Sequence, residues 1–267
     1  MSDKIFFFDI DNTLLDHQTN RIPDSALQAV DDLKRAGHTV AIATGRGYGH
    51  ALEFIEQIKP AYAVVQNGAQ ILKGTQIMVK KPLPQVGLAE LFQLIESKGF
   101  YYGINDGLIG HVSAQVPEVM IPMDSVEITF QSDLDFYRAN EVFQGWLFFP
   151  EHLDDTMFPE LRARFPQFDY VRWHATAVDV LPAGVNKMTG CHWVLSDANI
   201  HINNSFAFGD GLNDIEMLQG VGTGIAMGNA HPRLKAVANR IAEPIHQDGL
   251  ARMVAQLQME FNDSKYA

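Results

Sequence analysis

Residues Ile5–Thr13, with the sequence IFFFDIDNT, carry the clearest indication of the fold. A continuous apolar and aromatic run that ends in polar residues is typical of a buried strand, which we predict over Lys4–Phe8. Residues two apart in an extended chain point the same way, so Asp9 and Asp11 would be neighbours just beyond this strand. Open α/β sheets bind ligands at the carboxyl ends of their strands. The stretch therefore predicts a central strand of an α/β sheet with two carboxylates at its ligand-binding end.

Strand and helix patterns alternate from this stretch as far as Val65. The first predicted helix starts at Pro23, carries apolar residues on one face and ends at Gly37. It is followed by a predicted strand, helix and strand over His38–Ala43, Tyr48–Ile58 and Ala61–Val65. This βαβαβ order favours a doubly wound, Rossmann-like α/β fold, in which a parallel sheet is connected by right-handed crossovers.

The alternation stops at a predicted hairpin, Ala69–Leu72 and Gln76–Lys80, and mixed helices and strands follow it. It returns with a helix from Asn186 to about Ser196, a strand over Ser205–Phe208, a helix over Leu212–Gln219, a strand over Thr223–Met227 and a helix over His231–Asn239. The simplest interpretation is a core domain formed by residues 1–81 and 185–267. An inserted α+β cap domain at residues 82–184 would interrupt it.

Composition and charge argue against several classes of protein. The 267 residues are 46% hydrophobic and 19% charged, which suits a folded chain with a full core. Twenty Lys and Arg against 32 Asp and Glu give a net charge of −12, which argues against nucleic-acid and membrane-surface binding. The single cysteine, Cys191, excludes an internal disulfide framework and suits the reducing cytoplasm. The sequence leaves open whether the chain is a monomer or a homodimer.

The pair Asp9 and Asp11 has two physical interpretations. Carboxylates this close repel each other, so one must be protonated or a cation must lie between them. A hard cation such as Mg²⁺ would keep Asp9 ionised as a nucleophile, and a carboxyl group with raised proton affinity can act as general acid and base. The alternative is that one carboxylate caps a turn and the other is solvated.

Two further polar motifs could hold an anion. At the end of the second strand, the hydroxyl of Thr44 and the backbone of Gly45 could bind a phosphate oxygen, although the same residues could form an ordinary turn. Lys187 opens the helix after the insertion, where an ammonium group and the positive helix end together attract an anion. The alternative for Lys187 is an ordinary surface lysine.

The run Gly209–Asp214, with the sequence GDGLND, follows another apolar strand. Asp210 follows the end of this strand, as Asp9 follows the end of the first one. Asn213 and Asp214 lie on the first turn of the next helix. Two acids and an amide beside Asp9 would complete an oxygen cage for a divalent cation. Capping of the helix is the alternative, because Asp and Asn are good N-caps. The order of the motifs along the chain, more than any one of them, favours a metal and phosphate site.

These motifs resemble those of the haloacid dehalogenase-like (HAD) superfamily, and specifically its Cof-type phosphatases. The matching segments are Asp9–Leu14, Ala43–Arg46, Gly184–Lys187 and Gly209–Leu218, with softer matches at Asn67–Ala69, Ala226–Ala230 and Asp248-Gly249. Asn12 stands where family members commonly carry Gly, and Asn186 where Ser is common. The resemblance implies a HAD core with a large cap, Mg²⁺ as cofactor, and hydrolysis of a phosphate monoester through an aspartyl-phosphate.

The resemblance also implies roles for individual residues. Asp9 would attack phosphorus, and Asp11 would protonate the leaving alcohol and later take a proton from the attacking water. Mg²⁺ would be held by the carboxylates of Asp9 and Asp210 and by the backbone carbonyl of Asp11. Asp214 would support that set by hydrogen bonding. The residues that would bind the transferring phosphoryl group are Thr44, Gly45, Lys187 and Asn213.

The substrate implied is a small phosphorylated metabolite, with sugar phosphates expected first, and the cap would contact its leaving group. Trp173 could stack on a sugar or ring, and Arg172 or His174 could hydrogen-bond it. An ordinary cap strand with one packed aromatic residue would explain the same residues. Two other functions stay open: a phosphosugar mutase on the same fold, and a non-catalytic sensor that binds a phosphorylated metabolite.

Overall fold

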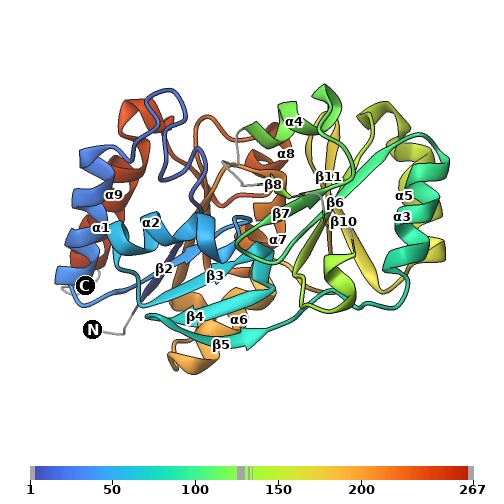
Figure 1. Ribbon diagram of the computed structural model, residues 1–267. Helices are drawn as coiled ribbons and strands as arrows, with labels where there is room; N and C mark the ends of the chain where they lie inside the picture. The colour runs from blue at the N-terminus through green and yellow to red at the C-terminus, as the bar shows by residue number, and fades with distance from the viewer. Residues whose placement is uncertain (1–3, 125–129, 132, 134, 264–267) are drawn as a thin grey trace.

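Two β-sheets lie side by side in the computed structural model, which describes residues 4–124, 130–131, 133 and 135–263 (Figure 1). Within these residues the core sheet has the strand order β14-β13-β12-β1-β2-β3-β4-β5. The cap sheet has the order β10-β11-β9-β6-β7-β8. The chain therefore has the expected α/β core with a second, largely antiparallel sheet as its cap.

The core is built from both ends of the chain. Its strands are β1 (Ile5–Phe8), β2 (Thr39–Ala43), β3 (Tyr62–Val65), β4 (Gln70–Lys73), β5 (Gln76–Lys80), β12 (Ser205–Gly209), β13 (Thr223–Ala226) and β14 (Arg240–Ile241). Its helices are α1 (Asp24–Arg35), α2 (Tyr48–Ile58), α6 (Lys187–Asp197), α7 (Ile215–Gly220), α8 (Pro232–Lys235) and α9 (Gly249–Asp263). Strands β1 to β3 and β12 to β14 are parallel, and the β4–β5 hairpin adds an antiparallel edge.

The cap is one continuous segment between β5 and α6. Its strands are β6 (Tyr101–Asn105), β7 (Gly110–Val112), β8 (Phe130–Gln131), β9 (Gln144–Phe148), β10 (Phe168–His174) and β11 (Ala177–Pro182). Its helices are α3 (Leu88–Ser97), α4 (Pro117–Met123) and α5 (Asp154–Arg164). The two connections to the core run through residues 81–87 and 183–186, and we propose to divide the chain into its domains there.

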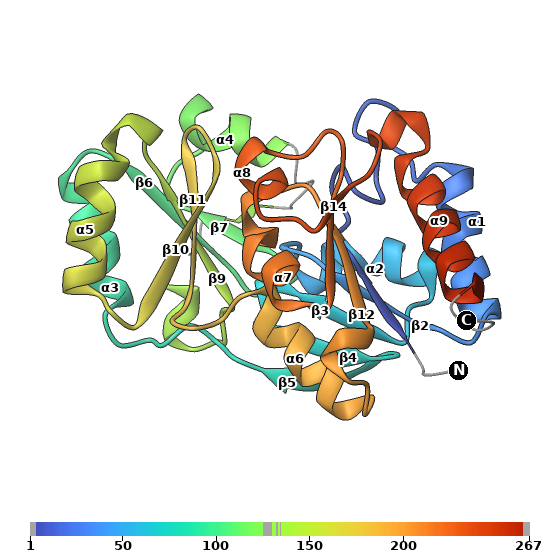
Figure 2. The same cartoon turned by 180° about the vertical axis from the view of Figure 1, so that it is seen from behind.

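Strand β1 occupies the centre of the core sheet, between β2 and β12, and all four of its side chains are fully buried. Helices α1, α2 and α9 cover one face of the sheet and α6 and α7 the other (Figures 1 and 2). A strand buried on both faces needs the uninterrupted apolar run that the sequence has at this position. Because β1, β2, β3 and β12 are parallel, their carboxyl ends meet at one edge of the sheet.

The helix predicted over His231–Asn239 is shorter than expected. It ends at Lys235, and the chain then pairs as β14 with β13. The reason lies at Asn239, whose backbone N–H donates to the carbonyl of Gly224 and whose side-chain oxygen accepts the N–H of Gly224. The predicted helix over Leu212–Gln219 likewise begins as a 3-10 turn, with α7 starting only at Ile215. No helix in the described part of the chain is long and apolar enough to cross a membrane.

Candidate active site

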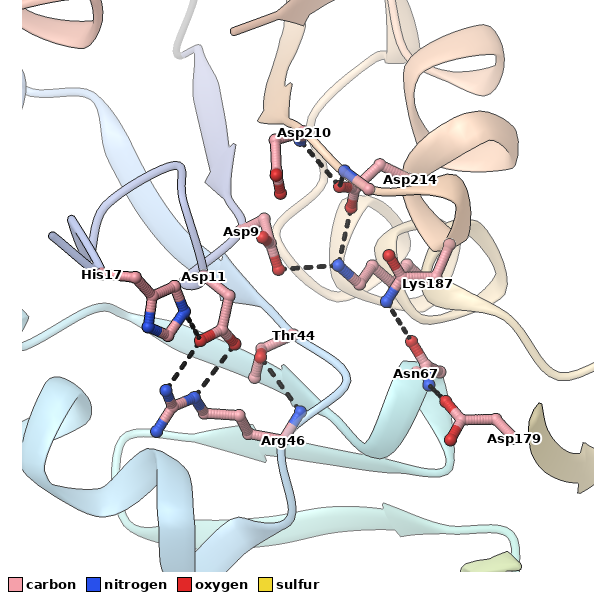
Figure 3. Close-up of polar contacts among 12 residues, drawn as sticks. Asp9, Asp11, His17, Thr44, Arg46, Asn67, Asp179, Lys187, Asp210 and Asp214 are labelled. Carbon is pink, nitrogen blue, oxygen red and sulfur yellow. Dashed lines mark hydrogen bonds and ion pairs between the residues drawn. The ribbon is translucent and has the colours of Figure 1, made fainter. Parts of the chain in front are cut away.

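The polar motifs meet at the carboxyl edge of the core sheet (Figure 3). Asp9 follows β1, and its backbone N–H donates to the carbonyl of Phe208 in β12 at 3.0 Å. Asp210 follows β12, and its backbone carbonyl accepts the N–H of His231 at 2.9 Å. Thr44 follows β2 and is completely buried, with its hydroxyl oxygen accepting the N–H of Arg46 at 3.1 Å. The ladders of neighbouring parallel strands thus set the positions of these side chains.

Lys187 lies at the centre of the site with 1% of its surface exposed. Its Nζ donates to Asp9 Oδ1 at 2.7 Å and to Asp214 Oδ1 at 2.6 Å. A capping box between Asn186 and Thr189 fixes the first turn of α6 and therefore the origin of this side chain. Burial lowers the pKa of Lys187, but the charges of Asp214 and Asp9 outweigh it, so the net pKa is raised. The ammonium group is therefore charged at all physiological pH values.

Both carboxylate oxygens of Asp214 are already engaged. Oδ1 binds Lys187, and Oδ2 accepts the backbone N–H groups of Asp210 and Gly211, each at 3.0 Å. Gly209 has to be glycine at this point, since a Cβ there would lie 2.5 Å from Asp214 Cγ. These contacts suit Asp214 to holding the Asp210 turn and Lys187 in place.

The carboxylates around Lys187 carry more negative charge than it can balance. One oxygen from each of Asp9, Asp210 and Asp214 lies within 4.8 Å of the others. Burial, partly offset by Lys187, raises the pKa of Asp9 to about 7. Burial and the charge of Asp9 raise the pKa of Asp210 to about 9. A cluster of oxygen ligands whose charge is only partly compensated is what a hard divalent cation stabilises, so these residues fit Mg²⁺.

Asp11 is held differently from its neighbour Asp9. Arg46 donates to both of its oxygens, at 3.0 and 2.7 Å, and His17 Nε2 lies 2.9 Å from Oδ1. Burial would raise the pKa of Asp11, but the hydrogen bonds from His17 and Arg46 and the charge of Arg46 lower it well below its usual range. Asp11 is therefore ionised in this arrangement and has no proton to give.

A second polar group connects the two sheets. Asp179, on β11 of the cap, accepts a hydrogen bond from Asn67 Nδ2 at 3.0 Å (Figure 3). Asn67 Oδ1 in turn accepts one from Asn213 Nδ2 at 2.9 Å. Asn67 lies in the turn after β3. Burial raises the pKa of Asp179 to about 7, although donors on Gln144 and Asn67 and the charge of Lys187 oppose this rise.

A cavity of about 540 Å³ lies between the core edge and the cap. The predicted site residues that line it are Asp9, Asp11, Gly45, Arg172, Trp173, Asp210 and Asn213. Thr44, Lys187 and Asp214 lie behind this lining, in contact with it. His174 does not line the cavity, and its Nδ1 lies 3.0 Å from the hydroxyl of Thr176. Arg172 is committed to the cap itself, because it forms a bidentate ion pair with Asp154 and donates to two backbone carbonyls.

Several lining residues were not predicted from the sequence. From the cap they are Asn105, Gln144, Trp146 and Asp179, and from the core His17, Asn229 and His231. Two of the missed positions carried a signal. Asp179 is the only acid in the otherwise apolar strand β11. Asn67, which bonds to Asp179 without lining the cavity, lies two residues beyond the end of β3 and within one of the softer family matches. His17 carried none, since its contact with Asp11 depends on the path of a loop.

Comparison with known proteins identifies relatives of this fold. A family model for haloacid dehalogenase-like hydrolases matches residues 6–254. The Bacillus subtilis protein named "Putative phosphatase YkrA" is 36% identical over 96% of this chain and 98% of its own. The Bacillus subtilis 5-amino-6-(5-phospho-D-ribitylamino)uracil phosphatase YitU is 27% identical over 93% of this chain and 95% of its own.

Among solved structures, the HAD subclass IIB sugar phosphatase BT4131 superimposes with a TM-score of 0.82 at 28% identity. The match covers 96% of this chain and 99% of that one. The likeness therefore extends over the cap as well as the core. The chain belongs to the haloacid dehalogenase-like hydrolases and, as its relatives are named, is a hydrolase of the phosphatase class.

Proposed function

We propose that the chain is a Mg²⁺-dependent phosphatase of small phosphorylated metabolites, with sugar phosphates as the expected substrates. The observation that carries this proposal is the buried ammonium of Lys187, held between Asp9 and Asp214 beside the cavity. The cavity wall formed by the cap adds two indole rings, Trp146 and Trp173, to polar side chains, and this mixture suits a hydroxylated or ring-shaped leaving group. We also place the protein in the cytoplasm, where its one cysteine would stay reduced.

The reaction would proceed in two steps at Asp9. A carboxylate oxygen of Asp9 forms a bond to phosphorus while the bond from phosphorus to the leaving oxygen breaks, and Asp11 gives that oxygen a proton. A water oxygen then forms a bond to phosphorus, the bond to Asp9 breaks, and Asp11 takes the proton of that water. The products are an alcohol and inorganic phosphate, with Asp9 again a carboxylate and Asp11 again protonated, as each was at the start of the first step.

Charge balance explains why the other residues are needed. Lys187 opposes the rise that burial causes in the pKa of Asp9, and its positive charge lies beside the site that the phosphate would occupy. Mg²⁺, held by the carboxylates of Asp9 and Asp210 and the backbone carbonyl of Asp11, would supply the remaining positive charge that a dianionic phosphate requires beside an anionic nucleophile. Thr44 and Asn213 would hold the phosphoryl oxygens by hydrogen bonding.

The ion pair of Asp11 adds one requirement to this mechanism. A general acid must carry a proton, yet Arg46 and His17 hold Asp11 ionised. Its carboxyl group has to leave these partners before the first step, and leaving them also removes the cause of its lowered pKa. We infer that substrate entry moves Asp11 from Arg46 toward the leaving oxygen.

A phosphate-release screen tests the proposal. The purified protein is assayed on sugar phosphates, nucleotides and cofactor phosphates, with Mg²⁺ and with EDTA. We expect release that requires Mg²⁺, is abolished in Asp9→Asn and is unchanged in Asp31→Asn, which alters an exposed acid on α1. Equal release by Asp9→Asn would remove Asp9 as the nucleophile. Little release with activation by a sugar bisphosphate would indicate a mutase, and binding without turnover would indicate a sensor.

A further inference from the structure

Three hydrogen-bonded side chains link the cap to the phosphate side of the cavity (Figure 3). Asp179 comes from cap strand β11, Asn67 from the core turn after β3, and Asn213 from the core turn after β12. The bonds between them measure 3.0 and 2.9 Å. Asp179 is 5% exposed and Asn67 1% exposed, so water competes little for either bond.

Asp179, at the cap end of this series of hydrogen bonds, sets their direction. In its ionised form Asp179 accepts hydrogen bonds and cannot donate them, whereas an amide can turn either its oxygen or its nitrogen toward a neighbour. Asp179 therefore requires Asn67 to present its NH₂ group, which leaves the oxygen of Asn67 facing Asn213. That oxygen in turn requires Asn213 to present an NH₂ group of its own.

Packing against two glycines fixes where the Asn213 amide lies. A Cβ on Gly45 would lie 3.2 Å from Asn213 Nδ2, and one on Gly211 would lie 2.7 Å from Asn213 Oδ1. The nitrogen is thus beside Gly45 and the oxygen beside Gly211. Asn213 donates one of its two N–H groups to Asn67 and lines the cavity, so the second N–H is available to a phosphoryl oxygen bound beside Gly45.

The turn that carries Asn67 is held rigidly in an uncommon backbone conformation. Gln66 and Asn67 have φ values of 50° and 52°, a region in which non-glycine residues are rare and Asn is tolerated better than most. The N–H of Asn67 donates to the carbonyl of Thr44 at 3.0 Å. Gly68 approaches the start of α6 so closely that a Cβ would lie 2.3 Å from the carbonyl oxygen of Asn186. Such backbone strain concentrates at functional sites.

We propose that Asp179 is a positioning residue, which acts through Asn67 to keep the NH₂ group of Asn213 directed at the transferring phosphoryl group. Without an acceptor at position 179 the side-chain amides of Asn67 and Asn213 can each rotate so that oxygen and nitrogen exchange places. Asn213 would then turn its oxygen toward the phosphoryl oxygens. Because Asp179 belongs to the cap, the phosphate donor is set only while the cap lies against the core as it does here. This inference rests on the proposed phosphatase function.

The first experiment removes the acceptor. Steady-state hydrolysis of p-nitrophenyl phosphate is compared in the wild type, Asp179→Leu and Asp179→Asn. We expect kcat/KM to fall about ten- to a hundredfold in Asp179→Leu, as for loss of a hydrogen bond that involves a charged group. Asp179→Asn should lose less than about threefold, because the amide oxygen at 179 can still accept from Asn67.

The second experiment separates positioning from a direct contact with the leaving group. Orthovanadate has no leaving group, so its inhibition constant should rise in Asp179→Leu in proportion to the loss of kcat/KM. In an Asn213→Ala background, Asp179→Leu should cost less than about twofold more, because the group that it positions is gone. Additive losses, or an unchanged inhibition constant for orthovanadate, would overturn the inference.

The third experiment reverses the bond polarity. Asn67→Asp places two carboxyl groups in contact and should lose activity. The double variant Asn67→Asp with Asp179→Asn should regain kcat/KM to within about threefold of the wild type, since the new carboxylate at 67 accepts from both neighbours. If the double variant does not regain kcat/KM while its melting temperature equals that of the wild type, the proposed action of Asp179 through Asn67 on Asn213 is wrong. A wild type that hydrolyses no phosphate monoester would instead refute the proposed function.

Discussion

Replacement of Lys187 by methionine tests the electrostatics of the site most directly. The side chain is 1% exposed and contacts two buried carboxylates at 2.7 and 2.6 Å, and methionine keeps most of its volume without its charge. Removing one partner of a buried ion pair costs about 3–5 kcal/mol, because the remaining charge is left uncompensated. For a chain of this size each kcal/mol lowers the melting temperature by about 2–4 °C. We therefore expect Lys187→Met to melt about 6–20 °C below the wild type in EDTA at neutral pH.

The assay is thermal unfolding in the absence of metal, with hydrolysis of p-nitrophenyl phosphate measured in parallel. Lys73→Met is the matched control, because Lys73 pairs with Asp197 at 2.7 Å but is half-exposed, and water screens such a pair. Its melting temperature should hardly change. Lys187→Met should also lose kcat/KM by at least about a hundredfold, as one charge opposite the developing phosphoryl charge is removed. A fall in melting temperature of less than about 2 °C, or retained hydrolysis, would show that Lys187 does not compensate these two carboxylates.

Three further predictions concern metal, pH and packing. Mg²⁺ at about a hundred times its dissociation constant should stabilise the protein by about 2.7 kcal/mol, which raises the melting temperature by about 5–10 °C. Asp210→Asn should lose most of this shift. An equal shift in the variant would argue against Asp210 as a ligand. The pKa of Asp179 is raised from 3.8 to about 7 on folding, so folding takes up a proton between these values and stability falls as pH rises through them. Asp179→Asn removes this loss. The free energy of unfolding of the variant minus that of the wild type, measured by thermal unfolding, should be about 2–3 kcal/mol larger at pH 8 than at pH 5. A difference that does not depend on pH would contradict the raised pKa. Gly190→Ala on α6 places a Cβ 2.4 Å from Val64 Cγ1 and should destabilise by about 1–3 kcal/mol in the same assay, whereas the exposed Ser196→Ala on the same helix should not.

Local sequence patterns were sufficient to predict much of the core. Helix α2 begins and ends where predicted, at Tyr48 and Ile58, because a glycine-rich turn precedes it and Lys59-Pro60 stops it. The meeting of Asp9 with Asp210 could be predicted because both follow buried strands, and parallel strands place their carboxyl ends together. Strand β14 could not, since two residues carry too little pattern and its pairing depends on Asn239.

The cap and its contacts could not be predicted in the same way. Strand β9 pairs with both β6 and β11, and the sequence gives no indication of this order, because the paired residues lie far apart along the chain. The bonds from Arg46 to Asp11 and from Asn67 to Asp179 depend on side-chain rotamers and on where the cap lies. They join residues that no local pattern connects.

The placement of β1 between β2 and β12 has a consequence for how the chain is made. Its four apolar residues leave the ribosome first among the core strands, but one of its two partners, Ser205–Gly209, follows only after the whole cap has been translated. At about 5–20 residues per second this interval lasts about 10–40 s. During that time one hydrogen-bonding edge of IFFF stays open to any other nascent strand. A chaperone that binds the first forty residues early would prevent aggregation through this open edge.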